Sequence, residues 1–384
     1  MTALFNLDKT NDTAKQAFLI RITCFFWLLG KLASYKSWIA DRSLPTVALF
    51  EFFDALPNSV HIISFLVSIL LIVAIIAKPL KILIQLFMVV EIFSVLLDVL
   101  RIQPWEYLYL FIIGFYITFK QSPAIFYKCL LLIIAATYIF SGLHKFNAAF
   151  LHTTWDNFFL RKVFGFSDAQ IPAGIHYAGV FFSVGEFLLG ILLLATKRKS
   201  STVIALITMH LFLIVVNAVI SAQPANSIVP WNILMIFILL YILKHSYKNQ
   251  YSLGKPLGLP KLSSCIILLF WYVLPFSNIF GFWALPLSSG MYTGKPPRVY
   301  ICWDDFGKKH IPVQYSLNSK PTKFCNNGRL LLLSNWTHLE ATQAPFPAVW
   351  YYERLYKRLK EKYPNDAIKM VYTYYPFIHV TEIR

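Results

Sequence analysis

Apolar runs long enough to cross a lipid bilayer recur along most of this chain of 384 residues. The hydrocarbon core of a bilayer is about 30 Å thick, and a helix of roughly 17–25 apolar residues crosses it. Only 14% of the residues are charged, against about 25% in ordinary soluble domains. The sequence therefore predicts an all-α polytopic membrane bundle in a lipid bilayer and excludes a soluble enzyme built on one core. We expect about nine transmembrane helices, at residues 16–34, 59–77, 80–99, 104–119, 124–143, 176–195, 202–220, 230–244 and 262–283.

Basic residues are unevenly distributed among the loops that would connect these helices. The chain has 35 Lys and Arg against 18 Asp and Glu, a formal net charge of +17. In a soluble protein this excess would suggest nucleic-acid binding, but in a membrane protein it marks cytoplasmic loops. Basic residues gather in alternate loops, for example at 197–199 and 244–261, and are absent from 221–229. We therefore expect no nucleic-acid partner, a cytoplasmic N-terminus and an extracytoplasmic C-terminus. A bacterial inner membrane is expected as the location.

The composition changes after the last apolar run, which divides the chain into a transmembrane domain at 1–285 and a small extracytoplasmic α+β domain at 286–384. Residues 299–315 have the pattern of a strand, a turn and a second strand. An amphipathic helix is expected at 348–366, ended by Pro364, and a last strand at 368–380. Such a domain is near the lower size limit of independent domains.

Five cysteines are scattered along the chain without a CxxC pair or a metal-ligand spacing. Three of them lie in apolar runs, where a thiol behaves as a small hydrophobic group. Cys302 and Cys325 lie in polar sequence and are candidates for a disulfide if their domain faces an oxidising compartment. No metal is predicted.

Ionisable residues inside the expected spans are few, and each is a functional-site hypothesis by default. Arg21 and Lys31 lie near the ends of the first span and are expected to extend to the headgroups. For Arg21 the alternative is a pair with a buried carboxylate. Glu91 is mid-span and must pair with a cation, share a proton or stay neutral. Asp98 lies on nearly the same helical face as Glu91. The two carboxylates form either a polar path or part of an internal ion pair. His210 is also mid-span and is interpreted as a hydrogen-bonded contact between helices.

The most polar membrane-proximal stretch follows the fifth expected span. It delivers His144, Lys145 and Asn147, then His152, Trp155 and Asp156, to the outer interface. A lysine held in a dry pocket loses its charge, and its neutral amine is then a base or a nucleophile. Alternatively, Lys145 extends to the headgroups among interfacial aromatic anchors. Both interpretations are open on composition alone.

This stretch, with Tyr138, Ser141-Gly142-Leu143-His144-Lys145-Phe146-Asn147, Phe150 and Trp155, resembles the transmembrane domain of vitamin K-dependent gamma-carboxylases. Their bacterial relatives, the horizontally transferred transmembrane domain family, share this domain. Further similarities are Arg21-Ile22, His210-Leu211, Trp231-Asn232 and the segment 288–294. The carboxylases open their fourth span with an Asn-His pair, where this chain has Trp105-Glu106. They also carry a long β-rich luminal portion, which is not matched by the short tail of this chain.

The resemblance implies that Lys145 deprotonates reduced vitamin K or menaquinol at the outer face. The predicted catalytic residues of this chain are Lys145, His144, His210 and Glu106, and the predicted cofactor-binding residues are Trp155, Asn147 and Glu186. The short tail favours a related quinone-linked oxidoreductase or lyase over a carboxylase of protein glutamate.

Two other functions remain open at the level of sequence. One is a non-catalytic scaffold or partner subunit that binds a protein or peptide through its outer domain. The other is a proton-coupled transporter with Glu91, Asp98, Glu186 and His210 along a proton path. A cavity that opens only outward near Lys145 would favour the enzyme, a path open to both sides would favour the transporter, and scattered ion pairs would favour the scaffold.

Overall fold

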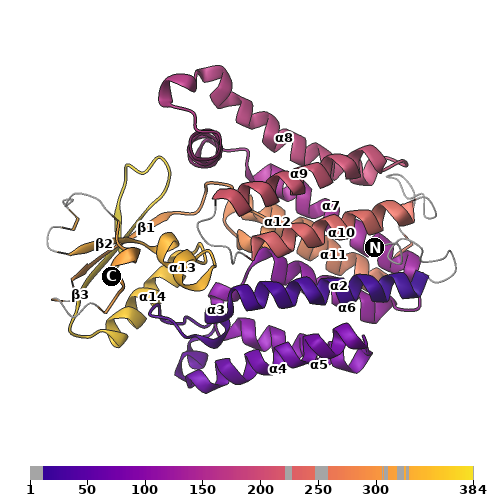
Figure 1. The fold of residues 1–384 in the computed structure, drawn as a ribbon, viewed down its shortest axis with the longest axis horizontal. Helices are drawn as coiled ribbons and strands as arrows, with labels where there is room; N and C mark the ends of the chain where they lie inside the picture. Colours follow the sequence, from indigo (N-terminus) through magenta and orange to yellow (C-terminus); the bar gives the residue numbers. More distant parts are fainter. Residues whose placement is uncertain are drawn as a thin grey trace.

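The computed structural model describes residues 12–220, 227–246, 258–304, 306, 310–317, 324–325 and 328–383. Long helices lie roughly side by side in a bundle, and a small sheet with two helices is attached to one end of it (Figure 1). The long helices are α2 (Asp12–Ala33), α4 (Asn58–Ala77), α5 (Lys81–Leu96), α6 (Pro104–Phe119), α7 (Pro123–His144), α8 (Ala173–Ala195), α9 (Ser200–Ile220) and α10 (Ile228–Ser246). A last helical segment comprises α11 (Lys261–Leu268), η5 (Leu269–Val273), α12 (Leu274–Ser277) and η6 (Asn278–Phe280).

Among the described residues, seven helical segments are long and apolar enough to cross a membrane, which makes this a multi-pass membrane protein by length and composition. The expected third and fourth spans, α5 and α6, are helices of 16 residues each. Both fall just below the length needed to span about 30 Å without help. The expected count of nine therefore becomes seven long helices and two short ones. The third span is shortened because Asp98 caps the 3₁₀ turn η2 (Val99–Arg101), and the next helix begins at Pro104.

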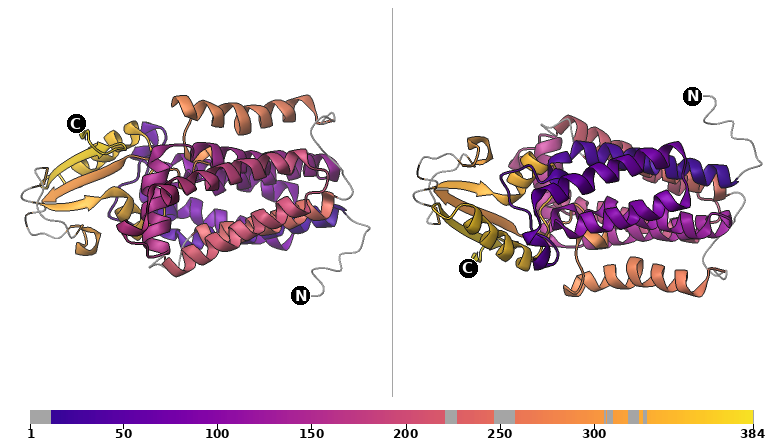
Figure 2. Two further views of the ribbon diagram at one scale, coloured as in Figure 1. Left: turned by 90° about the horizontal axis from the view of Figure 1, so that it is seen from above. Right: turned by 90° about the horizontal axis from the view of Figure 1, so that it is seen from below.

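Helix α7 lies at the centre of the bundle, and 78% of the residues in its most apolar stretch are buried. Its closest neighbour is α8, because glycines allow the two backbones to touch. A Cβ on Gly190 would lie 2.7 Å from Ile139 N, and a Cβ on Gly142 would overlap the backbone of Phe187. By contrast, the segment 261–280 lies along the outside of the bundle (Figure 2), and only 22% of the residues in its most apolar stretch are buried.

The tail domain is a four-stranded antiparallel sheet with strand order β2-β1-β3-β4. Its strands are β1 (Arg298–Asp304), β2 (Arg329–Leu332), β3 (Ala367–Thr373) and β4 (Thr381–Ile383), and its helices are α13 (Leu333–Ala341) and α14 (Val349–Lys362). The expected amphipathic helix is confirmed as α14. The strand expected at 368–380 is confirmed in its first part as β3, which ends at Thr373.

The prediction of a second hairpin strand before Tyr315 is wrong. Val313–Tyr315 form a 3₁₀ turn, in which Tyr315 N donates to Pro312 O, and β1 pairs instead with β2 and β3. Pro312 has no N–H for a strand ladder, which favours the turn. The disulfide between Cys302 and Cys325 is confirmed.

The tail shares a hydrophobic core with loops of the bundle. Leu44, Val47, Val99 and Leu100 pack with the tail's apolar residues in one cluster. Polar contacts fix the same interface, since Glu340 accepts hydrogen bonds from Ser43 N at 2.5 Å and from Leu44 N at 3.1 Å. The segment 286–294, which sequence assigned to the tail, also contacts the bundle, because Tyr292 OH donates to Asn217 Oδ1 at 3.3 Å.

Candidate functional site

The close contact of α7 and α8 places Lys145 against Glu186. Lys145 is the C-cap of α7, and its Nζ forms an ion pair with Glu186 Oε2 and donates to Ser141 Oγ at 2.8 Å. The side chains are only 5% and 8% exposed. Lys145 therefore does not extend to the headgroups, which excludes one of the two interpretations of this lysine. The structure also brings Glu186, predicted as a cofactor-binding residue, into contact with the predicted base.

His210 forms a chain of hydrogen bonds next to this pair. Tyr138 OH lies 2.7 Å from His210 Nε2, and His210 Nδ1 lies 2.7 Å from Asn232 Oδ1. Asn232 Nδ2 donates to Ile228 O, which fixes the orientation of the amide. Because Asn232 Oδ1 only accepts, His210 carries its proton on Nδ1 and accepts from Tyr138 through Nε2. The interpretation of His210 as a hydrogen-bonded contact between helices is confirmed.

Lys145, Glu186, Tyr138 and His210 all line one cavity of about 40 Å³, which we call the inner cavity. It is large enough for about three waters, at ~10–15 Å³ each. Two tryptophans, Trp231 and Trp271, also line it, and the Nε1 atoms of both are buried without a hydrogen-bond partner within the described parts of the chain. Buried indole N–H groups normally have an acceptor. The inner cavity therefore offers donors that water or a ligand oxygen would satisfy.

A larger cavity of about 420 Å³, the outer cavity, lies where the bundle meets the tail domain. It shares Pro104, Met291 and Tyr292 with the inner cavity, so the two are neighbours. Its other walls include Trp105 and Leu285 of the bundle side and residues of α13 and the loop after it, 334–347. Its lining is mostly apolar, which is typical of sites for small organic ligands.

Three further predicted site residues lie outside these cavities. His144 is buried beside Phe140 and is not part of the lining of either cavity. Asn147 bonds the backbone on both sides, with Nδ2 donating to His144 O and Oδ1 accepting from Phe150 N. Trp155 Nε1 donates to Ile175 O. Asn147 and Trp155 thus position the π-helix η3 (Phe150–Val163) and are not at the inner cavity.

Glu106, the remaining predicted catalytic residue, belongs to a second buried cluster between α2, α5 and α6. Its Oε2 accepts from Trp27 Nε1 at 2.6 Å. Nearby, Lys31 Nζ lies 2.7 Å from Glu91 Oε1, with both side chains fully buried, and 3.0 Å from the centroid of the Trp38 ring. The expectation that Lys31 extends to the headgroups is therefore wrong. The sequence could not reveal this pair, because it depends on how α2 packs against α5.

The structure also resolves the alternatives for Glu91 and Asp98. Glu91 pairs with Lys31, whereas Asp98 Oδ2 lies 2.5 Å from Arg42 Nη2. Arg101, buried between them, donates to the carbonyl oxygens of α3 (Tyr35–Ile39), including Trp38 O at 2.8 Å. The carboxylates are thus in two separate ion pairs and do not form a polar path.

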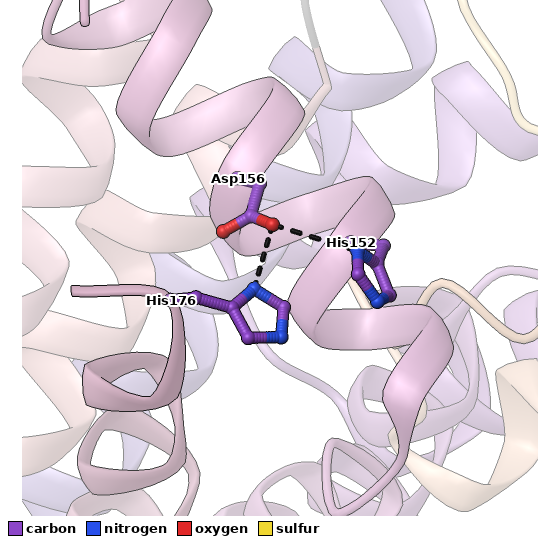
Figure 3. A group of neighbouring side chains, drawn as sticks. All are labelled: His152, Asp156 and His176. Atoms are coloured by element: carbon purple, nitrogen blue, oxygen red, sulfur yellow. Dashed lines mark hydrogen bonds and ion pairs between the residues drawn. The ribbon is translucent and has the colours of Figure 1, made fainter. Parts of the chain in front are cut away.

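A third polar cluster lies on η3 and the start of α8 and contains His152, Asp156 and His176 (Figure 3). Asp156 Oδ2 lies 2.7 Å from His176 Nδ1 and 3.6 Å from His152 Nδ1. Sequence analysis placed His152 and Asp156 at the outer interface but missed His176, which is 20 residues beyond Asp156. The spacing of four residues between His152 and Asp156 was the one feature of the sequence that could have indicated this cluster.

In comparisons with family models, curated proteins and solved structures, this chain has no significant match. A function can therefore be argued only from the residues of the chain and from their arrangement.

Proposed function

We propose that this chain is a membrane enzyme, similar to the vitamin K-dependent gamma-carboxylases, that oxygenates a quinol with Lys145 as the base. The observation that carries the proposal is the placement of the buried Lys145–Glu186 pair at a small cavity beside a larger apolar one. The substrate class is a naphthoquinol, either reduced vitamin K or menaquinol, as the sequence resemblance implies.

The proposed topology has nine crossings, with α5 and α6 as short spans, a cytoplasmic N-terminus and both cavities at the extracytoplasmic end. It is supported by the excess of basic residues in the loops opposite the tail. The loop 144–175 and the tail lie at the same end of the bundle, since the ring of His152 stacks on Tyr375 at 5.4 Å. A bacterial inner membrane would suit this arrangement.

The sizes of the cavities indicate where the substrate would lie. The inner cavity holds only a few waters, so it is too small for a fused quinol ring. The outer cavity, at about 420 Å³, falls within the ~300–1,000 Å³ that is usual for small-molecule sites. We therefore assign the ring to the outer cavity and proton-relaying water to the inner one, with Met291 and Tyr292 at their boundary.

The Lys145–Glu186 pair supplies the proton chemistry. Lys145 Nζ donates directly to Glu186 Oε2, which is the acceptor for one of its protons in the proposed reaction. Once that proton is on Glu186, the neutral Lys145 amine accepts a proton from the substrate hydroxyl in the outer cavity through the water of the inner cavity. Ser141 Oγ keeps Nζ in place at 2.8 Å. Overall, one quinol and one O₂ would give one quinone epoxide and one water, which balances atoms and electrons.

The lining of the inner cavity favours an enzyme over a transporter. Its residues come from the tail-side or central parts of α6 to α10, from Trp271 and from 289–292. Within the described ranges, no lining residue comes from the turns at 78–81, 120–123 or 196–200 at the far end of the bundle. Glu91, which a proton path would need, is paired with Lys31 in a different cluster. A proton path across the bilayer would need Glu91 and the inner cavity to be connected, and in the described part of the chain they are not.

The test is quinol-dependent oxygen uptake by purified protein in lipid nanodiscs, with quinone epoxide measured by mass spectrometry. Wild type should consume O₂ with reduced vitamin K or menaquinol, and Lys145→Ala should not. The double variant Lys145→Met/Glu186→Leu also lacks the base but leaves no charge unpaired, so it separates lost chemistry from lost folding.

Lys36→Ala is the matched control, because Lys36 is an exposed lysine at the same end of the bundle. It should keep wild-type uptake. Absence of uptake by well-folded wild type with both quinols would contradict the proposal and favour the non-catalytic scaffold. Wild-type uptake by the double variant would refute Lys145 as the base.

A further inference from the structure

We propose that His152, Asp156 and His176 form a binding site for a divalent transition-metal ion, best suited to Zn²⁺, at the tail end of the bundle. Each residue offers one ligand atom, and the three atoms lie within 4.8 Å of one another. Two histidines and one carboxylate are a common ligand set for Zn²⁺ and related ions. This site is separate from the Lys145 cavities, because none of the three residues lines them.

The donor atoms are close to the spacing that a metal requires. Ligands bound to Zn²⁺ at about 2.0–2.1 Å with tetrahedral angles lie roughly 3.3 Å apart. Here Asp156 Oδ2 lies 2.7 Å from His176 Nδ1 and 3.6 Å from His152 Nδ1. Figure 3 shows both imidazole rings beside the carboxylate, with one nitrogen of each directed to it. Small side-chain rotations would bring all three atoms around one ion.

The buried carboxylate of Asp156 is a second, independent reason for a cation here. Asp156 is 5% exposed, and its Oδ1 has no hydrogen-bond partner in the described portion of the chain. An unpartnered carboxylate oxygen is costly in a buried position. The hydrogen bond from His176 and the longer contact from His152 both reach only Oδ2. A bound ion would balance the charge that Oδ1 leaves uncompensated.

The backbone that carries the three residues is fixed by contacts independent of any ion. His152 and Asp156 lie four residues apart on η3, whose π-helical turn places them almost above one another. His176 lies in the first turn of α8. The two elements are joined by the Trp155 Nε1 bond to Ile175 O, and Gly179 allows the Trp155 ring to touch α8. A pre-formed site of this kind costs little to organise.

One side of the site is open. The side chain of His152 is 49% exposed, whereas those of Asp156 and His176 are 7% and 15% exposed. Three protein ligands with an accessible fourth position are typical of zinc sites that keep a bound water. Tyr375 of the tail stacks on His152 with the ring centroids 5.4 Å apart. A metal would therefore connect η3, α8 and, through this stacking, the tail domain.

The experiment uses full-length protein in detergent, purified without a polyhistidine tag and stripped with EDTA. Titration with Co²⁺, followed by its visible absorption, should show one tight site with the strong bands of a four-coordinate ion, and Zn²⁺ should displace it. His176→Ala and His152→Ala should each weaken Co²⁺ binding by more than about 100-fold, since even the loss of an outer partner of a ligand costs about 10–100-fold. His152 is half-exposed, so its replacement leaves the Asp156–His176 bond and the fold in place.

His310→Ala is the matched control. His310 Nδ1 lies 2.7 Å from Asp366 Oδ2 in the tail, a His–Asp pair with the same distance but outside the three-residue cluster. Its replacement should leave Co²⁺ binding unchanged. No Co²⁺ binding by wild type, or equal binding by the His152 and His176 variants, would mean a hydrogen-bonded cluster only and would overturn the proposal. The readout is independent of quinol oxygenation.

Discussion

Lys145 and Glu186 form a buried ion pair across the contact of α7 and α8, although 41 residues separate them in the sequence. The pair exists because the two helices touch at Gly142 and Gly190. It lines the inner cavity together with the His210 hydrogen-bond chain. Lys145 is thus a buried, partnered group, and its replacement should affect both stability and chemistry.

The ion pair should be visible in stability measurements. Removal of one partner of a buried pair leaves an uncompensated charge and costs about 3–5 kcal/mol. We expect Lys145→Ala to unfold at clearly lower denaturant or temperature than wild type. The double variant Lys145→Met/Glu186→Leu should recover most of this loss, because apolar replacement of a whole buried pair is often neutral. A single variant as stable as wild type would mean that Lys145 is solvated, contrary to the structure.

The helix contact itself can be tested at two glycines of known surroundings. An added Cβ at Gly142 would overlap the backbone of Phe187, so Gly142→Ala should push α7 from α8 and destabilise the protein by about 1–3 kcal/mol. It should also weaken the Lys145–Glu186 contact and lower any quinol-dependent activity. Gly185→Ala is the control, because a Cβ there meets nothing within 4 Å. Equal effects of the two substitutions on melting temperature would count against the close contact.

Glu106 provides a test that separates the two buried clusters. Glu106 was predicted as catalytic from the sequence, but its carboxylate accepts from Trp27 in the cluster of Lys31 and Glu91. We expect Glu106→Gln to retain quinol-dependent activity, since an amide oxygen still accepts from Trp27 Nε1. Glu186→Gln, measured beside it, should lose activity. Loss of activity in a well-folded Glu106→Gln variant would restore Glu106 to the catalytic set.

The disulfide should stabilise the tail domain. Cys302 and Cys325 are 23 residues apart, and closing a loop of this length contributes roughly 3 kcal/mol in the chain-entropy account. The variant Cys302→Ser/Cys325→Ser should therefore expose the tail to proteolysis at lower temperature. Oxidised wild type should not react with a thiol reagent at these two positions after denaturation. Full labelling of both without a reductant would contradict the assigned bond.

Lys199, in the turn between α8 and α9, should make stability depend on pH. Its Nζ donates to Leu193 O at 2.6 Å and Thr196 O at 2.8 Å, and burial lowers its pKa to about 8. In the unfolded chain a lysine has a pKa of about 10.4. Between these values the unfolded state binds more protons, so this group makes stability rise with pH from about 8 to 10.4 and contributes no slope below that window.

The control for this pH effect is the neighbouring lysine. Lys199→Met should flatten the rise in melting temperature between pH 8 and 10, whereas Lys197→Met, at an exposed position, should not. An unchanged slope in Lys199→Met would show that Lys199 is solvated in the folded protein.

Much of the fold follows from local sequence patterns. Apolar runs of sufficient length predicted the helices, and the amphipathic pattern after Ala348 predicted α14. The boundaries of the short helices α5 and α6 depend on Asp98 and Pro104, which end or begin helices locally. The strand β2 was missed because 24 residues, 305–328, separate it from its partner β1. A local alternation of apolar and polar residues does not reveal such a distant pairing.

The site was less predictable, for the same physical reason. Sequence analysis selected Lys145, Glu186 and His210 individually, because ionisable groups in apolar spans are unusual. It could not pair Lys31 with Glu91, or bring His176 to Asp156, because those contacts depend on the packing of separate helices. Trp271, with an unpartnered indole nitrogen at the inner cavity, was indistinguishable from other core aromatics, and Trp231 was noted only through the family resemblance.

The most direct test of Lys145 as the base is chemical rescue. Removal of the lysine side chain in Lys145→Ala leaves room beside Glu186 for a small primary amine. Oxygen uptake with menaquinol should be lost in this variant and return when methylamine or ethylamine is added, increasing with the concentration of free amine. Lys36→Ala should show no such dependence. Full activity of Lys145→Ala without amine, or no rescue at any amine concentration in folded protein, would contradict the assignment of Lys145 as the base.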